Sequence, residues 1–304
     1  MDNTEHINTV EWFFGYGGNH LGIKRVLPNL RLITVCEIEA YAVANILSKM
    51  ETGQLDEAPI WTDCKTFPTE PFKGGRVDLF IASYPCQPFS AAGKRKGPED
   101  ERHLWPYVRE FVRKTRPGIC FFENVEGHVS LGLREVLTDL VDLGYRVEID
   151  SGEPAWGLFS AAEVGAPQHR KRVFILAHSG KQGLPKSERK AIQPARRMHE
   201  RRTTTKLCGS LWPARPGEPQ HEWEEPRVLN GKLNPDWVES LQGVPPGWTQ
   251  LSNALPCENR IDRLRLLGNG VVPATAEKAF ITLINRIKNH GRNIEPVETQ
   301  MELF

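Results

Sequence analysis

The chain has 304 residues, of which 39% are hydrophobic and 25% are charged, and its formal net charge is +1. This composition is typical of a soluble globular protein, and the length is enough for one large domain or two ordinary ones. A net charge this small does not by itself indicate nucleic-acid binding, so any such affinity must come from local clusters.

The sequence also lacks the marks of a membrane, secreted or metal-binding protein. Its longest apolar stretches are strand-sized, too short to span a bilayer, and the N-terminus has no secretory signal pattern. Its six cysteines are widely spaced with no CxxC pair, which favours neither a zinc site nor a disulfide framework. We therefore expect a cytoplasmic protein with no membrane contact and no metal.

Strand-like and helix-like segments alternate up to about residue 180. Unbroken apolar strands that alternate with helices are typical of a mostly parallel sheet covered on both faces, so the sequence predicts an α/β fold. The predicted strands are 9–14, 30–39, a short one before 63, 77–83, 118–125, 145–150 and 172–178. The predicted helices are 40–50, 104–115 and 133–144.

The pattern changes near Ser179. Residues 181–206 contain nine Lys or Arg against two Glu, and proline, glycine and tryptophan are frequent from there to Trp248. We predict a discontinuous main domain, 1–179 and 257–304, and a small irregular domain at 180–256. Residues 273–290 predict an amphipathic helix that packs back on the main domain. Its apolar face is Phe280, Leu283, Ile284 and Ile287.

A glycine turn, FFGYGG at 13–18, lies between the first strand and a short helix. Glycines let the backbone approach a ligand closely, and a helix N-terminus offers unpaired N–H groups. Glu37 follows the second strand, where a carboxylate accepts from ribose hydroxyls, and Asp63 follows the third. Together they predict an adenosine-containing ligand across the carboxyl ends of the strands. The alternative is a tight turn with no ligand and two solvated carboxylates.

Cys86 follows the strand 77–83 and lies between Pro85 and Pro88, just before the cationic run GKRKG. A thiol in such a place is a nucleophile if nearby cations or helix ends favour the thiolate, and the run suits a loop that closes over an anionic substrate. The alternative is a buried packing cysteine.

Glu123 emerges from an apolar strand, which predicts a raised pKa and a carboxyl group that holds its proton near neutrality. The alternative for Glu123 is a carboxylate that caps a loop. Arg170 and Arg172, in PQHRKR, alternate onto one side of the chain, where they pair with Glu123, with a substrate or with solvent.

The series EWFFGYGG, CEIE, TDC, PCQPFS, ENV, PQHRKR and LGNGVVP, in this order, resembles the DNA (cytosine-5) methyltransferases. The resemblance covers about 10–178 and 233 to the C-terminal helix. The chain departs from the family pattern at Glu11, Trp12, Tyr84 and Gly270. Glycine at 270 replaces the family's frequent serine or alanine, and we expect it to loosen one backbone contact.

The resemblance implies a Rossmann-like S-adenosylmethionine-dependent methyltransferase that modifies the 5-carbon of a flipped-out cytosine. Cys86 would attack the 6-carbon of the ring, and Glu123 would donate a proton to the adjacent ring nitrogen. Arg170 would bind the base carbonyl and orient Glu123, while Arg172 would support phosphate or loop contacts. The residues implied for cofactor binding are Phe13, Gly15, Tyr16, Gly17, Gly18, Glu37, Ile38, Asp63, Cys64, Pro85, Asn269 and Val271.

The resemblance further implies double-stranded DNA as the partner and a monomer in a prokaryotic or phage-infected cell. A cognate restriction endonuclease is a candidate partner that need not touch the protein. Residues 180–256 would be the target-recognition domain, and the basic run 181–206 would hold phosphates unless it is a solvated linker. The alternatives are an RNA cytosine-5 methyltransferase, a protein that transfers a modified one-carbon group, and a binding module without catalysis.

Overall fold

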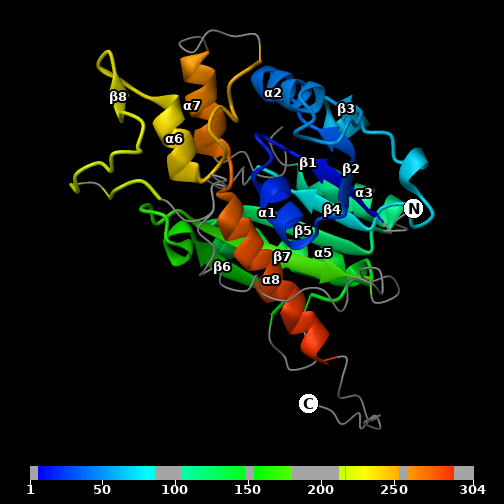
Figure 1. Ribbon diagram of the computed structural model, residues 1–304. Coiled ribbons are helices and arrows are strands. Elements are labelled where there is room, and N and C mark those ends of the chain that lie inside the picture. The colour runs from blue at the N-terminus through cyan, green and yellow to red at the C-terminus, as the bar shows by residue number, and fades with distance from the viewer. Residues whose placement is uncertain are drawn as a thin grey trace.

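A seven-stranded sheet forms the centre of the molecule (Figure 1). The computed structural model describes residues 6–85, 104–147, 154–179, 212–215, 217–252 and 259–290. The strands of the sheet are β1 (Ile7–Trp12), β2 (Leu30–Cys36), β3 (Ile60–Trp61), β4 (Leu79–Ala82), β5 (Ile119–Val125), β6 (Trp156–Ser160) and β7 (Lys171–His178). Their order across the sheet is β3-β2-β1-β4-β5-β7-β6.

The predicted mostly parallel sheet is confirmed. β1 pairs in parallel with β2 and β4, β2 with β3, and β4 with β5, whereas β7 runs antiparallel to both β5 and β6. The predicted strand 145–150 is reduced, within the described residues, to a bridge between Arg146 and His178. The edge strand β6 was not predicted.

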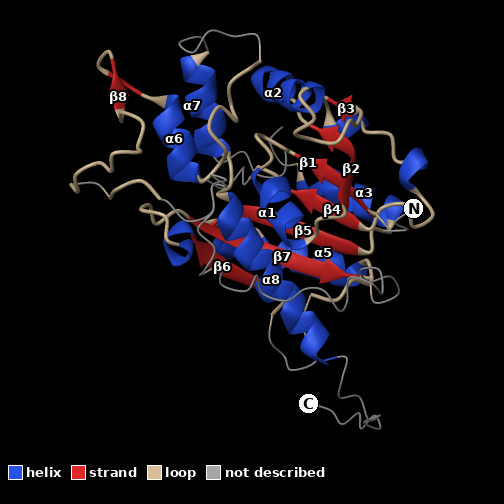
Figure 2. Cartoon of the chain, in the orientation of Figure 1, coloured by secondary structure: helices blue, strands red, loops and turns tan. Residues whose placement is uncertain are grey.

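Helices flank the sheet on both faces (Figure 2). They are α1 (Gly18–Val26), α2 (Ala40–Glu51), α3 (Trp105–Thr115), α4 (His128–Leu131), α5 (Leu133–Asp142), α6 (Pro235–Gln242), α7 (Arg260–Asn269) and α8 (Pro273–His290). Short 3-10 turns occur at η1 (Cys64–Thr66), η2 (Glu70–Phe72) and η4 (Ala161–Val164), and β8 (Val228–Leu229) forms a hairpin with β9 (Lys232–Leu233). No helix in the described ranges is long and apolar enough to cross a membrane.

The two faces of the sheet have separate cores because successive side chains of a strand point to opposite sides. Ile81 and Phe121 pack towards α1 and α8. Their cluster includes Phe280 and Leu283, two residues of the apolar face predicted for the C-terminal helix. Phe80 and Phe122 point the other way and pack against α3 and α5. The face of the sheet on which a residue near the end of a strand lies therefore follows from counting in steps of two from these core residues.

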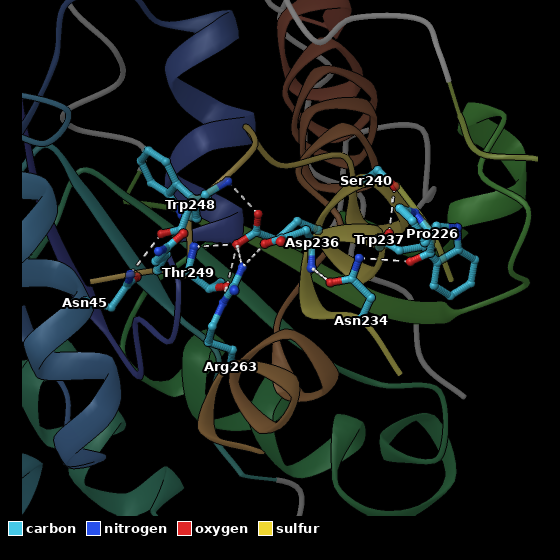
Figure 3. Close-up of polar contacts among 12 residues, drawn as sticks. Asn45, Pro226, Asn234, Asp236, Trp237, Ser240, Trp248, Thr249 and Arg263 are labelled. Carbon is cyan, nitrogen blue, oxygen red and sulfur yellow. Dashed lines mark hydrogen bonds and ion pairs between the residues drawn. The ribbon is translucent and has the colours of Figure 1, made fainter. Parts of the chain in front are cut away.

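The segment from α6 to Gln250 packs against α2 and α7 through Val238, Val244 and Trp248. Figure 3 shows the polar contacts that fix it, with Arg263 of α7 among Asp236, Thr249 and Trp248. Asn45 of α2 donates to the carbonyl oxygen of Trp248 at 2.8 Å. The segment from α6 to Gln250 is thus anchored to α2 and α7.

Candidate active site

The glycine turn after β1 has the backbone that its sequence predicts. Gly15 and Gly17 have φ of 57° and 81°, a region that glycine enters without steric cost. Phe13 also has a positive φ of 58°, which costs a non-glycine residue free energy, and its N–H donates to the Cys36 carbonyl oxygen at 2.7 Å. A Cβ on Gly15 would meet no atom within 4 Å, so the space beside the turn is open.

Glu37 is held against this turn. Its Oε2 accepts from the Gly15 N–H at 2.8 Å and its Oε1 from the Glu39 N–H at 2.8 Å. Its side chain is only 6% exposed, and burial raises the pKa of Glu37 although these backbone donors oppose the shift. The turn and the carboxylate after β2 therefore form one site.

The other residues expected beside Glu37 surround the same edge of the sheet. Asp63 Oδ1 accepts from the Lys65 N–H at 2.9 Å and so caps η1. Cys64 is buried, and burial raises the pKa of its thiol to about 11, which keeps it protonated at neutral pH. Ile38 is 69% exposed, an apolar side chain left uncovered at the edge of the site.

The segment after α7 closes against the glycine turn, more than 250 residues away in sequence. Tyr16 Oη donates to the Val271 carbonyl oxygen at 2.5 Å. A Cβ on Gly18 would lie 2.1 Å from that same oxygen, so only glycine permits this approach. Asn269, the last residue of α7, is exposed beside this contact.

The expectation that Gly270 loosens a contact is wrong. A Cβ at this position would lie 1.8 Å from Cε1 of the Tyr16 ring. The buried Tyr16 ring fills the volume that a serine or alanine side chain at 270 would need, so glycine is the residue that fits beside it.

We expect Gly270→Ser to destabilise the protein by about 1–3 kcal/mol, because the new side chain displaces the buried Tyr16 ring. The double variant Gly270→Ser with Tyr16→Leu should recover most of this loss. Urea unfolding measures both. Gly268→Ser is the matched control, since a Cβ there meets no atom within 4 Å. Equal losses at 268 and 270 would contradict the packing argument.

A buried ion pair lies at the ends of β5 and β7. Glu123 is 6% exposed and its Oε1 is 2.9 Å from Arg172 Nε. Burial raises the pKa of Glu123, as its apolar strand predicts, and Arg172, Ser83 and Arg170 act in the opposite direction. The pair puts a carboxyl group with high proton affinity beside a fixed cation.

The two arginines at the start of β7 have different partners. Arg172 makes the ion pair with Glu123 because Phe174 lies opposite Glu123 in the antiparallel register, which makes Arg172 its diagonal neighbour on the same face. Arg170 precedes β7, and its Nη2 donates to the carbonyl oxygens of Gly268 and Gly270 at 2.7 and 2.6 Å. Arg172 therefore orients Glu123, and Arg170 fixes the segment that closes the glycine turn.

Cys86, the cationic run GKRKG at 93–97 and the basic run 181–206 lie outside the described residues. The chain is described up to the exposed Pro85, and Tyr84 before it is anchored at both ends. Tyr84 Oη is 3.0 Å from His128 Nε2, and its carbonyl oxygen accepts from Asn124 Nδ2 at 2.9 Å. The strand end that leads to Cys86 is thus tied to the ENV segment.

The structure adds three residues that the sequence did not single out. Ser83 Oγ accepts from Asn19 Nδ2 at 2.8 Å, and Trp248 Nε1 donates to the Tyr16 carbonyl oxygen at 2.7 Å. The sequence did contain a signal for Ser83. Side chains alternate between the two faces of a sheet, so Ser83 is expected on the same face as Ile81, which is the face that also carries Glu123. Nothing in the sequence pattern indicated Trp248 or Asn19.

A glycine turn after β1, a carboxylate after β2 and a buried Glu–Arg pair meet at the carboxyl edge of one doubly covered sheet. This arrangement, on a sheet with one reversed strand, defines an α/β protein of the methyltransferase class. The chain belongs to the C-5 cytosine-specific DNA methylase family, whose family model matches residues 7–225.

Curated relatives support this assignment. The chain is 36% identical over 118 residues to the type II methyltransferase M.AplI of Arthrospira platensis, and 30% identical over 187 residues to M.BanI of Aneurinibacillus aneurinilyticus. These matches cover 38% and 57% of the chain and 32% and 39% of the relatives. The chain thus spans about a third to two fifths of the length of these relatives.

Solved structures share the fold. A mutant of Dnmt2 from Spodoptera frugiperda matches with a TM-score of 0.61, 16% identity, 92% of this chain and 100% of the other. EhMeth of Entamoeba histolytica matches with a TM-score of 0.61, 15% identity, 93% of this chain and 99% of the other. At these identities the likeness concerns the fold alone.

Proposed function

We propose that this protein is a sequence-specific DNA methyltransferase that methylates the 5-carbon of a flipped-out cytosine through a covalent adduct with Cys86. The observation that carries the proposal is the buried pair of Glu123 and Arg172. The pair lies one strand away from the chain that leads to Cys86, at the edge that also holds the glycine turn and Glu37. A carboxyl group, a cation and a thiol at one strand edge are the groups that this reaction needs.

The residues present fit S-adenosylmethionine as the methyl donor. Gly15 faces open space, and each Glu37 oxygen accepts one backbone N–H and keeps a lone pair for a ribose hydroxyl. The exposed Ile38 offers an apolar surface beside it for an adenine ring. Bound, the cofactor supplies an electrophilic methyl group. The full proposed binding set is that of the family: Phe13, Gly15, Tyr16, Gly17, Gly18, Glu37, Ile38, Asp63, Cys64, Pro85, Asn269 and Val271.

The chain's own groups activate the base. The Cys86 thiolate forms a bond to the 6-carbon, the electron pair of the 5,6-double bond forms a double bond between the 5- and 4-carbons, and the pair of the 4-carbon to 3-nitrogen double bond moves onto the 3-nitrogen. That nitrogen takes the proton of the Glu123 carboxyl group, which leaves the 5-carbon nucleophilic. Arg172 holds Glu123 in place through the step. After the 5-carbon has taken the methyl group, loss of the 5-proton to water, departure of the thiolate and return of the 3-nitrogen proton to Glu123 restore the aromatic ring.

DNA as the substrate follows from the family and from the basic run at 181–206. A base inside a duplex is out of reach, so the cytosine must rotate into the site at a cost of a few kcal/mol. Residues 180–256 are the proposed target-recognition domain, and 1–179 with 257–304 the catalytic one. Basic residues that contact phosphates make binding fall steeply with salt.

The test is methyl transfer from labelled S-adenosylmethionine to duplex DNA and, in parallel, to transfer RNA, with mass spectrometry of the released nucleosides. We expect 5-methylcytosine in the duplex and none in the RNA. Glu123→Gln is the matched control and should lose about 10²–10⁴-fold in rate, the usual contribution of a positioned acid. Label confined to RNA would overturn DNA as the substrate, and a different transferred group would overturn methylation.

A further inference from the structure

A row of polar side chains crosses the sheet beneath α1, at the carboxyl ends of the strands. It begins with Glu11 on β1 and continues through Ser83 after β4 to Glu123 on β5. Because side chains alternate along a strand, these three lie on the same face as Ile7, Ile81 and Phe121, which pack in the apolar cluster under α1 and α8. Asn19 and His20, in the first turn of α1, lie against this row, with His20 Nδ1 3.5 Å from Glu11 Oε2.

Ser83 lies beside Glu123 in this row. Ile81 is in register with Phe121 and Ala82 with Phe122 in the parallel pair of β4 and β5, so the next residues, Ser83 and Glu123, are also adjacent. The Ser83 hydroxyl lowers the pKa of the Glu123 carboxyl group, as a donor beside a carboxylate does. The Ser83 N–H donates to the Trp12 carbonyl oxygen at 3.3 Å, which keeps the backbone of this residue in the sheet.

Asn19 decides which way the Ser83 hydroxyl proton points. Its Nδ2 donates to Ser83 Oγ at 2.8 Å, and its side chain is buried with 3% exposure. A hydroxyl oxygen that already accepts from an amide has its single proton free for another acceptor. The Ser83 proton is therefore directed at the Glu123 carboxyl group, whose other restraint is Arg172.

We propose that Ser83, oriented by Asn19, is a positioning residue that holds the Glu123 carboxyl group and links it to the cofactor turn. The proposal rests on the role of Glu123 given above. Asn19 follows Gly18 directly, so Asn19 and Ser83 would connect the turn that binds the cofactor to the acid that protonates the base. Removal of either side chain should free Glu123 to move relative to Arg172.

The expected change in proton affinity has a definite sign. A hydroxyl that donates to a carboxylate stabilises the ionised form, so Ser83 lowers the pKa of Glu123 below the value that burial alone would set. Among the described residues, Arg172 and Arg170 act on Glu123 in the same direction, and the Tyr16 hydroxyl also faces it. All three remain in a Ser83 variant, so the loss of the hydroxyl should raise the pKa of Glu123.

The test reads Glu123 directly, in a ¹³C-glutamate NMR titration of the full chain with Glu123→Gln to assign the signal. In Ser83→Ala we expect the Glu123 pKa to rise by roughly one pH unit, a typical worth of a hydrogen bond to a charged group. Ser83→Thr should restore the parent value. Ser130→Ala is the control, because that serine is exposed and bonds only locally to the Gly127 carbonyl oxygen. Asn19→Ala should shift the pKa in the same direction by less, and it carries the test if Ser83→Ala does not fold.

Activity gives the second readout. If protonated Glu123 is the acid, the alkaline limb of the kcat profile should move up with the NMR value in Ser83→Ala. Its plateau should fall roughly three- to tenfold through loss of orientation. An unchanged Glu123 titration in Ser83→Ala overturns the proposal. A shifted titration in a protein whose parent methylates no cytosine supports the contact and instead overturns the proposed function.

Discussion

Cys86→Ser is expected to abolish methyl transfer, a fall of at least about 10³-fold, because a thiolate and not a hydroxyl is available as a nucleophile near neutral pH. Binding of S-adenosylmethionine should stay within about twofold of the parent, since the glycine turn and Glu37 lie on other strands. Single-turnover transfer and calorimetry measure the two effects. Methylation at the parent rate would show that the assigned nucleophile is wrong.

The described cysteines cannot replace Cys86. Cys36, Cys64 and Cys120 are all buried, and burial raises the pKa of each thiol, so none forms a thiolate at neutral pH. Tyr84, two residues before Cys86, is by contrast held in place by His128 and Asn124, and Pro85, which follows it, is exposed.

The parent protein, incubated with cofactor and a duplex that contains 5-fluorocytosine, should form a stable covalent adduct. Cys257→Ser should still form it, whereas Cys86→Ser should not.

The sequence predicted the centre of the fold well and its margins less well. β4 and β5 are short runs of buried apolar residues, and such runs indicate central strands of a parallel sheet whatever their neighbours are. β6 contains a glycine and an exposed Leu158, so its pattern does not alternate cleanly. In α7, Ile261 is 74% exposed and Arg263 is buried, whereas isoleucine is usually buried and arginine usually exposed. The hydrophobic pattern of the sequence therefore does not indicate this helix.

The candidate site divides in the same way. Motif residues at the carboxyl end of a strand, such as Glu37 just after β2 and Glu123 near the end of β5, were placed correctly at the carboxyl edge because topology alone brings them there. Which of Arg170 and Arg172 makes the ion pair with Glu123 does not follow from the sequence, since alternation says that both lie on one side but not which partner each one meets. That choice depends on the register between β5 and β7 and on where α7 ends, neither of which leaves a local sequence signal.

The second large effect is expected at Arg263, which joins α7 to α6 and to Thr249 in the segment after α6. Its side chain is 1% exposed, and its Nη2 lies 2.5 Å from Asp236 Oδ1 and 2.9 Å from Glu239 Oε1 (Figure 3). Burial opposes the charge of Arg263, but the hydrogen bonds and charges of these two carboxylates outweigh it and raise its pKa. Glu239 is fully buried and also accepts from the backbone N–H groups of Gly247 and Thr249.

Arg263→Met should therefore lower the free energy of unfolding by about 3–5 kcal/mol, because it leaves the Glu239 charge buried without its cation. Arg263→Lys should lose less, since it keeps the charge but not the planar fork. Arg265→Met is the matched control on the same helix. Arg265 is 61% exposed and pairs with Glu39 at the surface, so its loss should cost less than about 1 kcal/mol.

The same variant tests whether this network reaches the cofactor turn. Thr249 follows Trp248, whose Nε1 donates to the Tyr16 carbonyl oxygen, so a loosened segment should release the turn as well. We expect Arg263→Met to weaken S-adenosylmethionine binding under conditions where it is still folded, and Arg265→Met to leave it unchanged. If urea unfolding shows the expected loss at Arg263 and calorimetry shows parent affinity, the network stabilises the fold without supporting the turn. Equal stability of the two variants would mean that Glu239 finds another partner once Arg263 is gone.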